Sequence, residues 1–251
     1  MLVAIDIGNS TIGFGFVHDG RVSHVVKVEN ELASELVRVK LDNFFESSRE
    51  RYAIKKVVIC SVVPEAQRKL QGWIKKVWGI QPLIVGKDIK APIVNRYKSP
   101  RQVGKDRLLC AFAARELYGA PAVVIDLGTA ITFDGISSRG EYLGGAIIPG
   151  LRLSAEALFE KTALLPRVRL APPPHNRVIG RTTEESILSG LFHGYGALCD
   201  GMVERLGQDM GCQPKVVMTG GYANILAKFM KHPVAAVDEE LIFRGIYLLT
   251  D

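Results

Sequence analysis

The chain has 251 residues, of which 47% are apolar and 23% are charged, and its formal net charge is +6. This length and apolar content suit one large domain or two fused half-domains with an ample core. No apolar run is long enough for a transmembrane helix, and the N-terminus leads straight into a strand without the zones of a signal peptide. The four cysteines form no close pair, which argues against a zinc site or a disulfide framework. We therefore expect a cytoplasmic protein.

The surplus of basic residues carries no nucleic-acid signature. Lys and Arg are spread among acidic residues, and no basic block is interleaved with aromatic side chains. Attraction of small anionic substrates accounts for the positive charge equally well. We expect neither a nucleic-acid partner nor a membrane partner.

The first elements predicted along the chain are three strands joined by short turns. Residues 2–5 are a short apolar run rich in β-branched side chains, followed by the turn Asp6-Ile7-Gly8-Asn9-Ser10-Thr11. Further strands are predicted over 12–17 and 22–28. The segments that follow are then predicted to alternate between helix and strand: a helix over 31–51, a strand over 57–63, a helix over 65–78 and a strand over 83–85. Such alternation indicates βα crossovers and a parallel portion of the sheet.

The second half begins by repeating the first. After a loop over 92–104 and a helix over 106–118, the apolar run 122–125 leads into the turn Asp126-Leu127-Gly128-Thr129. The later segments are predicted as strands over 131–136, 142–148, 216–218 and 234–237, and as helices over 151–161, from 182 or 183 to 206, and over 239–249. Both halves therefore open as strand, acidic turn, strand, turn and strand.

The two acidic turns are the strongest functional signal among these elements. Each places a carboxylate, a glycine and a hydroxyl or amide at a tight bend after a buried strand. Backbone N–H groups can approach a phosphate at glycine, hydroxyls can donate to its oxygens, and a carboxylate can hold Mg²⁺. A single Asp-x-Gly is only a turn signal, but the repeated context favours a polyphosphate site.

Two other glycine-containing segments leave alternatives open. Gly104-Lys105-Asp106-Arg107 lies at a predicted helix start, where Arg107 could pair with a carboxylate and Asp106 could accept a proton from a hydroxyl. By itself this tetrapeptide favours a helix-capping Asp beside a solvated Arg. Thr219-Gly220-Gly221 could let the backbone approach adenine or a phosphate, or could be an ordinary turn between strand and helix.

Taken together, these pieces resemble type III pantothenate kinases, which belong to the superfamily of acetate and sugar kinases, heat-shock chaperone ATPases and actin. The resemblance extends from residue 3 to about residue 247. The motifs that carry it are Asp6-Ile-Gly-Asn-Ser-Thr, Ser61-Val-Val-Pro, Gly104-Lys-Asp-Arg, Asp126-Leu-Gly-Thr-Ala, Gly144-Gly-Ala-Ile-Ile-Pro-Gly150-Leu, Gly180-Arg-Thr-Thr and Thr219-Gly-Gly. Ser10 stands where the family more often has Thr, and Lys105 occupies a variable position.

The resemblance implies a role for each of these residues. It implies that ATP phosphates and Mg²⁺ are bound around Asp6, with the adenosine beside two glycines; the ATP-binding residues would be Asp6, Ile7, Gly8, Asn9, Ser10, Thr11, Ile12, Gly13, Thr129, Gly220 and Gly221. Asp126 would help to bind a monovalent cation, K⁺ or NH₄⁺. Asp106 would be the general base. Pantothenate would be bound by Tyr97, Gly104, Lys105, Asp106, Arg107 and one of Thr182 and Thr183, of which Thr183 matches the family's usual threonine.

The resemblance also implies a fold, an activity and an assembly. The expected fold is α/β, with two related ribonuclease H-like (actin-like ATPase) half-domains, residues 1–118 and 119–251, each a mixed sheet flanked by helices, and the active site in the cleft between them. The expected activity is transfer of the ATP γ-phosphoryl group to the primary hydroxyl of pantothenate, the first step of coenzyme A biosynthesis. A homodimer is expected. The alternatives are a related kinase with another hydroxyl acceptor and a non-enzymatic regulatory homologue.

Overall fold

The computed structural model describes residues 1–29, 54–173 and 177–250, and its contacts divide the chain into two units. The first unit comprises residues 1–93, 98–113 and 240–251, and the second comprises residues 94–97 and 114–239. The helix predicted over 31–51 lies outside the described residues. The predicted boundary between residues 118 and 119 stays a prediction; by contacts, the carboxyl-terminal segment 240–251 groups with the first unit.

The first unit is built on a five-stranded mixed sheet with the order β3-β2-β1-β4-β5. Its strands are β1 (Leu2–Ile7), β2 (Thr11–His18), β3 (Arg21–Glu29), β4 (Lys56–Ser61) and β5 (Leu83–Ile84). The first three form an antiparallel meander, and β4 and β5 run parallel to β1. The predicted meander and parallel portion are therefore confirmed.

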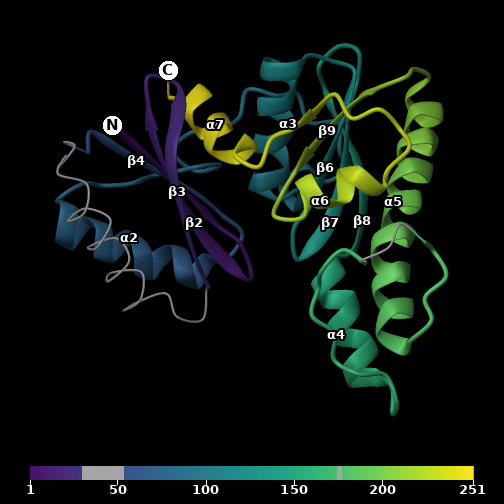
Figure 1. Ribbon diagram of the computed structural model, residues 1–251. Coiled ribbons are helices and arrows are strands. Elements are labelled where there is room, and N and C mark those ends of the chain that lie inside the picture. The colour runs from purple at the N-terminus through teal and green to yellow at the C-terminus, as the bar shows by residue number, and fades with distance from the viewer. Residues whose placement is uncertain (30–53, 174–176, 251) are drawn as a thin grey trace. The chain divides into compact units, whose positions relative to one another are not determined.

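Helices cover both faces of this first sheet. Helix α2 (Pro64–Trp78) packs Leu70 and Ile74 against one face, along which it runs in Figure 1. On the other face, α3 (Lys105–Tyr118) and α7 (Leu241–Leu248) pack with residues of β1 and β4. Side chains of β2 alternate between the two faces of the sheet, and glycine on the α7 face allows this helix to pack closely. A Cβ on Gly15 would lie 2.6 Å from the Phe243 ring of α7. Phe14 and Phe16 point into the opposite cluster, beneath α2.

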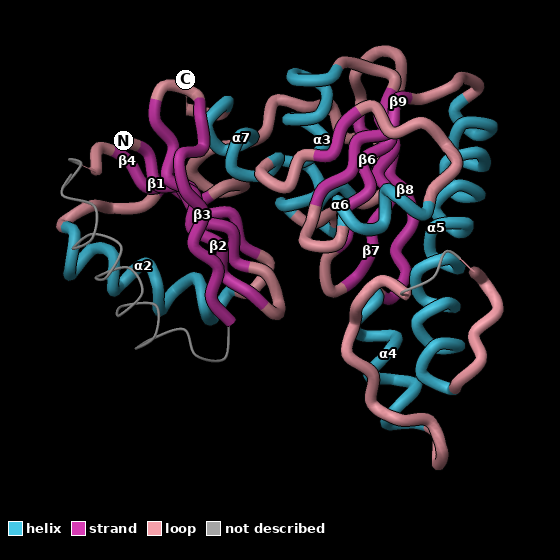
Figure 2. Tube along the Cα trace, in the orientation of Figure 1, coloured by secondary structure: helices cyan, strands magenta, loops and turns pink. Residues whose placement is uncertain are grey.

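The second unit repeats the same sheet. Its order is β8-β7-β6-β9-β10, with antiparallel β6, β7 and β8 and with β9 and β10 parallel to β6. The strands are β6 (Ala122–Leu127), β7 (Ala130–Ile136), β8 (Tyr142–Pro149), β9 (Lys215–Thr219) and β10 (Ala236–Val237). Figure 2 shows β6 to β9 side by side in magenta. The predicted duplication thus extends to all five strands.

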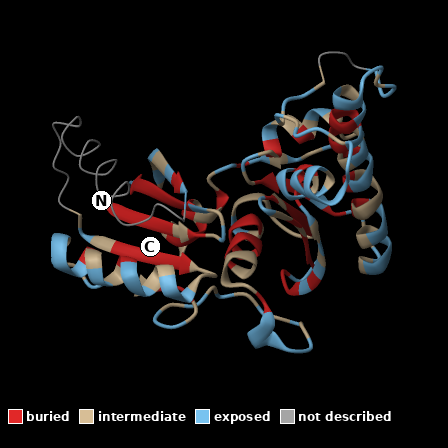
Figure 3. Ribbon diagram, turned by 90° about the horizontal axis from the view of Figure 1, so that it is seen from below, coloured by how far each residue is buried: buried red, intermediate tan, exposed pale blue. Residues whose placement is uncertain are grey.

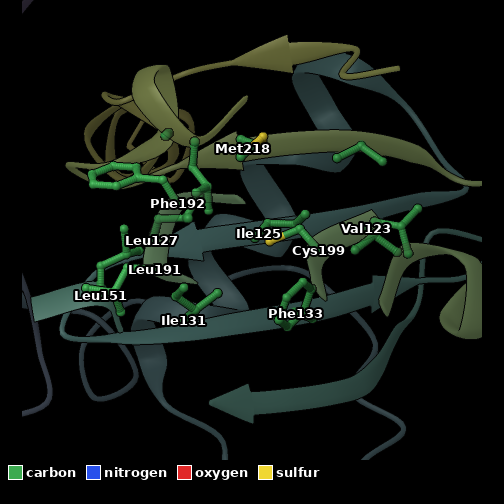
Figure 4. Close-up of a cluster of buried hydrophobic side chains, with 14 of the residues drawn as sticks. Val123, Ile125, Leu127, Ile131, Phe133, Leu151, Leu191, Phe192, Cys199 and Met218 are labelled. Atoms are coloured by element: carbon green, nitrogen blue, oxygen red, sulfur yellow. The ribbon is translucent and has the colours of Figure 1, made fainter. Parts of the chain in front are cut away.

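The remaining elements of the second unit cover its sheet. They are α4 (Leu151–Lys161), α5 (Thr183–Met210), the single turn α6 (Ala223–Leu226) and the 3-10 turn η3 (Ala227–Phe229). A 3-10 turn, η2 (Pro100–Gln102), precedes α3 in the first unit. In the core shown in Figure 4, Leu191, Phe192 and Cys199 of α5 lie over Ile125 and Leu127 of β6. Figure 3 shows burial concentrated along the strands.

The observed elements differ from the predicted ones mainly at their ends. Helix α5 runs four residues beyond the predicted end at 206 and stops where Gly211 adopts a left-handed conformation, with φ of 65°. Strand β4 ends at Ser61, whose hydroxyl accepts a hydrogen bond from the Val63 N–H, so the backbone turns before Pro64 begins α2. Among the described residues, no helix is long and apolar enough to cross a membrane.

Candidate functional site

The parallel strands of the first unit end together, and their carboxyl ends carry the first candidate residues. Asp6 near the end of β1 pairs in register with Cys60 near the end of β4, and β5 lies beside β4. Gly86 follows β5 after a single residue. Ligands of α/β sheets bind at this carboxyl edge, because loops and helix N-termini converge there. The fold therefore places Asp6 where a ligand is expected.

The first acidic turn closes at this edge. The N–H of Gly8 donates to the carbonyl of Thr11 at 2.9 Å, and residues 8–11 separate the paired residues Ile7 and Ile12. Asn9 and Thr11 are exposed, and Ser10 is half-buried. The turn can thus offer amide and hydroxyl groups to an anion while its ends stay in the sheet.

Lys105 reaches the same neighbourhood from the start of α3. Gly86 is left-handed, with φ of 87°, and a Cβ there would lie 2.6 Å from Lys105 Cδ and 2.7 Å from Lys105 Cε. The lysine stem therefore lies across the bare backbone of Gly86. Burial raises the pKa of the Cys60 thiol well above its ordinary value; the charges of Asp6 and Asp106 raise it further, and Lys105 lowers it. These four side chains consequently share one electrostatic environment.

Asp106 occupies the first turn of α3 and folds back toward the preceding glycine. Its Oδ1 accepts the N–H of Arg107 at 2.8 Å, and a Cβ on Gly104 would overlap the same oxygen. Burial raises the pKa of the Asp106 carboxyl, and its hydrogen bond from the Arg107 N–H and the Arg107 charge only partly offset the rise. Asp106 is thus bound to the helix N-terminus and is a stronger base than an exposed aspartate.

The second acidic turn is shorter than the first. Residues 128–130 separate the paired residues Leu127 and Ile131, and the Gly128 N–H donates to the Ala130 carbonyl at 3.2 Å. The N–H of Gly150, at the start of α4, donates to the Thr129 carbonyl at 2.9 Å. A Cβ on Gly150 would lie 2.5 Å from that carbonyl oxygen, so the close approach requires glycine. Thr129 itself is exposed at the turn.

Asp126 contacts the backbone of the double glycine. Asp126 pairs in register with Thr219 of β9, and Gly220 follows with φ of 89°. A Cβ on Gly220 would lie 2.6 Å from Asp126 Oδ1 and 2.7 Å from backbone atoms of Leu127. Gly221 has open space where a Cβ would be. The structure therefore brings Asp126 and Gly220 together, as equivalents of Asp6 and Ser61 in the first sheet.

The other candidate substrate residues also lie in or beside the second unit's elements. The ring of Tyr97 packs on Gly144, whose φ is 115°. Thr182 caps α5, because its hydroxyl accepts the Glu185 N–H at 3.1 Å, while Thr183 begins the helix and is exposed. The capping bond occupies Thr182 and leaves the Thr183 hydroxyl outside that arrangement.

Sequence reasoning did not single out several side chains of this region. Cys60 was an ordinary member of an apolar strand, and Gly86 lay at the end of another. The ion pair between Arg96 and Glu141 joins residues 45 positions apart, a separation over which no local spacing rule applies. Only the repeat itself could have identified Cys60, as the equivalent of Thr219 in the second half.

The two repeated mixed sheets flanked by helices have the fold of the actin-like ATPase class, which includes kinases. A protein described as a 2-dehydro-3-deoxygalactonokinase from Sinorhizobium meliloti superposes with a TM-score of 0.56 at 12% identity, covering 100% of this chain and 96% of that one. A protein described as a Baf family transcriptional activator from Campylobacter jejuni gives 0.58 at 22% identity, covering 98% and 96%. At these identities the likeness concerns the fold.

The family follows from sequence comparison. The model of the family described as type III pantothenate kinase matches residues 2–205. The type III pantothenate kinase of Persephonella marina is 41% identical over 250 residues, covering 98% of this chain and 97% of that protein. The chain therefore belongs to the type III pantothenate kinase family, whose members are ATP-dependent kinases that act with a divalent metal ion.

Proposed function

We propose that this type III pantothenate kinase transfers the ATP γ-phosphoryl group to the primary hydroxyl of pantothenate, giving phosphopantothenate, with Asp106 as general base. The observation that carries the assignment is geometric: Asp6 pairs in register with Cys60 at the carboxyl edge of the first sheet, and Lys105, the neighbour of Asp106 in α3, lies across Gly86 just after β5 at the same edge. A phosphate-type turn and the half-buried carboxylate of Asp106 are thus both on the first unit, near the carboxyl edge of its sheet, an arrangement suited to phosphoryl transfer to a hydroxyl.

The ATP phosphates are assigned to the first turn and its counterpart. Residues 6–13 form the first loop around the ATP phosphates. In this loop Gly8 allows the backbone to approach a phosphate, and Asn9, Ser10 and Thr11 supply polar side chains. Thr129 donates its exposed hydroxyl from the second turn. Gly220 and Gly221 lie beside the adenosine, where the open space at Gly221 leaves room for a flat group.

Asp6 is the residue assigned to Mg²⁺. Mg²⁺ retains several waters and is commonly held by one or two carboxylates together with substrate phosphates. A half-buried carboxylate beside a phosphate turn fits that requirement without further protein ligands. When bound, Mg²⁺ neutralises charge on the phosphoryl oxygens.

The acceptor side is assigned to the start of α3. Asp106 takes the proton from the primary hydroxyl of pantothenate while the oxygen of that hydroxyl bonds to the γ-phosphorus. The bond from this phosphorus to the β–γ bridging oxygen breaks, and ADP is released. Arg107 pairs with the pantothenate carboxylate. Gly104, Lys105 and Tyr97 are the further residues assigned to pantothenate. Thr183, rather than the capping Thr182, completes it.

Asp126 is assigned to a monovalent cation, K⁺ or NH₄⁺. The proposal is supported by the arrangement of the second turn, where the Asp126 carboxylate lies against the Gly220 backbone. Carboxylate and backbone carbonyl oxygens are the donors that such cations prefer. We also propose that the chain acts as a homodimer in the cytoplasm, where its free thiols would stay reduced.

The reaction is tested by ADP release that depends on pantothenate, measured with and without added K⁺. Turnover is expected with pantothenate and Mg-ATP, and it should rise with K⁺. A panel of other small hydroxylated acids and sugars serves as the acceptor control. Efficient turnover of a panel member with none for pantothenate would replace the proposed acceptor, and absence of any turnover would contradict the enzymatic assignment.

A further inference from the structure

The segment that carries Tyr97 is attached to the amino end of β8 by backbone pairing. The Tyr142 N–H donates to the Val94 carbonyl at 2.8 Å, and the Arg96 N–H donates to the Tyr142 carbonyl at 2.8 Å. This short ladder explains why residues 94–97 group with the second unit although their sequence neighbours group with the first.

A side-chain ion pair reinforces the same attachment. Both Nε and Nη2 of Arg96 donate to Glu141 Oε1, at 3.1 and 2.5 Å. The Glu141 side chain is only 10% exposed, whereas that of Arg96 is 57% exposed. Arg139 also faces the carboxylate, with Nη2 3.3 Å from Oε2, and Ser137 accepts the Glu141 N–H at 3.2 Å. Contacts within its own turn therefore orient Glu141 independently of Arg96.

The residue after Arg96 is held in a defined orientation. The Tyr97 N–H donates to Asn95 Oδ1 at 3.0 Å, which fixes the local turn. A Cβ on Gly144 would lie 3.1 and 3.2 Å from Tyr97 Cδ2 and Cε2. The ring thus packs on a glycine of β8, two residues after the strand position that Arg96 binds through its backbone.

We propose that Arg96 is a positioning residue for pantothenate binding: its pairing with Glu141 fixes the segment 94–97 on β8 and so keeps the Tyr97 ring on Gly144. The inference rests on the proposed role of Tyr97 in the acceptor pocket. Arg96 acts through Tyr97 and does not itself touch the substrate. Loss of the pairing removes the side-chain anchor that supplements the two backbone hydrogen bonds of the segment, so the ring can more readily leave the orientation that binds the acceptor.

The expected kinetic effect is confined to the acceptor. Arg96→Ala should raise the KM for pantothenate roughly 3- to 10-fold, as expected for the loss of one charge-assisted contact. The kcat and the KM for ATP should stay within about 2-fold, because the general base and the phosphate turns are untouched. Arg96→Lys should recover part of the pantothenate KM, since it retains the charge but not both donors. Arg96 is more than half exposed, so the variants should fold.

Arg139→Ala is the matched control. It removes an Arg that pairs with the same carboxylate, but Arg139 is not on the Tyr97 segment, so its pantothenate KM should equal that of the wild type. The decisive measurement is the double variant Arg96→Ala with Tyr97→Ala. If Arg96 acts through Tyr97, the double variant should have the KM of Tyr97→Ala alone.

The outcomes distinguish failure of the positioning role of Arg96 from failure of the proposed pantothenate-binding role of Tyr97. A raised KM for Tyr97→Ala with an unchanged KM for Arg96→Ala would overturn the positioning role and leave the Tyr97 assignment standing. Additive effects in the double variant, or an equal rise in Arg139→Ala, would also overturn it. An unchanged KM for Tyr97→Ala itself would overturn both.

Discussion

Gly220→Ala is the substitution whose consequences the structure defines best. Gly220 has φ of 89°, a conformation in which an L-residue places its Cβ too close to the backbone. The added Cβ would also lie 2.6 Å from Asp126 Oδ1 and 2.7 Å from the N and C atoms of Leu127. Two of these three neighbours are backbone atoms inside β6, which a side-chain rotation cannot move.

The cost follows from these two effects. The left-handed conformation costs an alanine about 1–2 kcal/mol. Overpacking a rigid environment costs about 1–3 kcal/mol more. Their sum is roughly 2–5 kcal/mol of the free energy of unfolding. For a chain of this size each kcal/mol corresponds to about 2–4 °C, so the melting temperature should fall by about 4 °C or more.

Gly221→Ala is the matched control, and its effect should have the opposite sign. A Cβ at Gly221 meets no atom within 4 Å, and the residue is not left-handed. Replacing such a glycine restricts mainly the unfolded chain and stabilises by about 0.4–1 kcal/mol. Thermal unfolding of both variants, followed by circular dichroism, gives the comparison without any assumption about ligands.

The same pair of variants tests the cation assignment. Gly220→Ala displaces Asp126 Oδ1, so half-maximal activation should require more K⁺, whereas Gly221→Ala should retain the wild-type K⁺ titration. Equal melting temperatures for the two variants would refute the steric reasoning. A destabilised Gly220→Ala with an unaltered K⁺ titration would refute the cation role of Asp126 alone.

Four further predictions follow from the same geometry. Asp106→Asn should lower kcat by about 10²–10⁴-fold, measured by ADP release, with the pantothenate KM little changed; wild-type activity would remove Asp106 as the base. Because burial raises the Asp106 pKa above its ordinary 3.8, the wild-type acid limb of kcat/KM should lie above pH 3.8, as the base is lost when pH falls through its pKa; a limb at or below 3.8 would contradict this. Asp126→Ala should abolish activation by K⁺. Thr183→Ala should raise the pantothenate KM about 10-fold, whereas Thr182→Ala should mainly cost about 1 kcal/mol of stability through the lost helix cap; the reverse pattern would exchange their roles.

The fold was predictable from the sequence because its signals are local and repeated. The two apolar runs before Asp6 and Asp126 are short and rich in β-branched residues, and short glycine-containing turns join them to the strands that follow, as in a meander. The βα alternation after the first meander then gives the parallel strands. Element ends were less predictable: Ser61 ends β4 through a side-chain bond that competes with the ladder, which no apolar pattern reveals.

The supporting contacts were not predictable, because they join distant segments. Gly86 and Lys105 meet only once β5 and α3 are both in place. The pairing of Arg96 with Glu141 requires the segment before η2 to add to β8. Such contacts depend on topology, and a single sequence supplies no information on which loop lies beside which strand.

Topologically equivalent positions in the two halves differ in ways that suit different ligands at the two turns. Asp6 and Asp126 occupy equivalent positions in β1 and β6, but residues 8–11 separate the paired residues in the first turn and only residues 128–130 do so in the second. The longer turn can present more polar groups to an anion, whereas the shorter one is held by the Gly150 N–H and can offer less backbone. At the next strand, Ser61 stands where Gly220 is left-handed, and the Asp126 carboxylate lies against the Gly220 backbone. The proposed division, with phosphate and Mg²⁺ at Asp6 and a monovalent cation at Asp126, therefore follows the differences between the repeats and not their likeness.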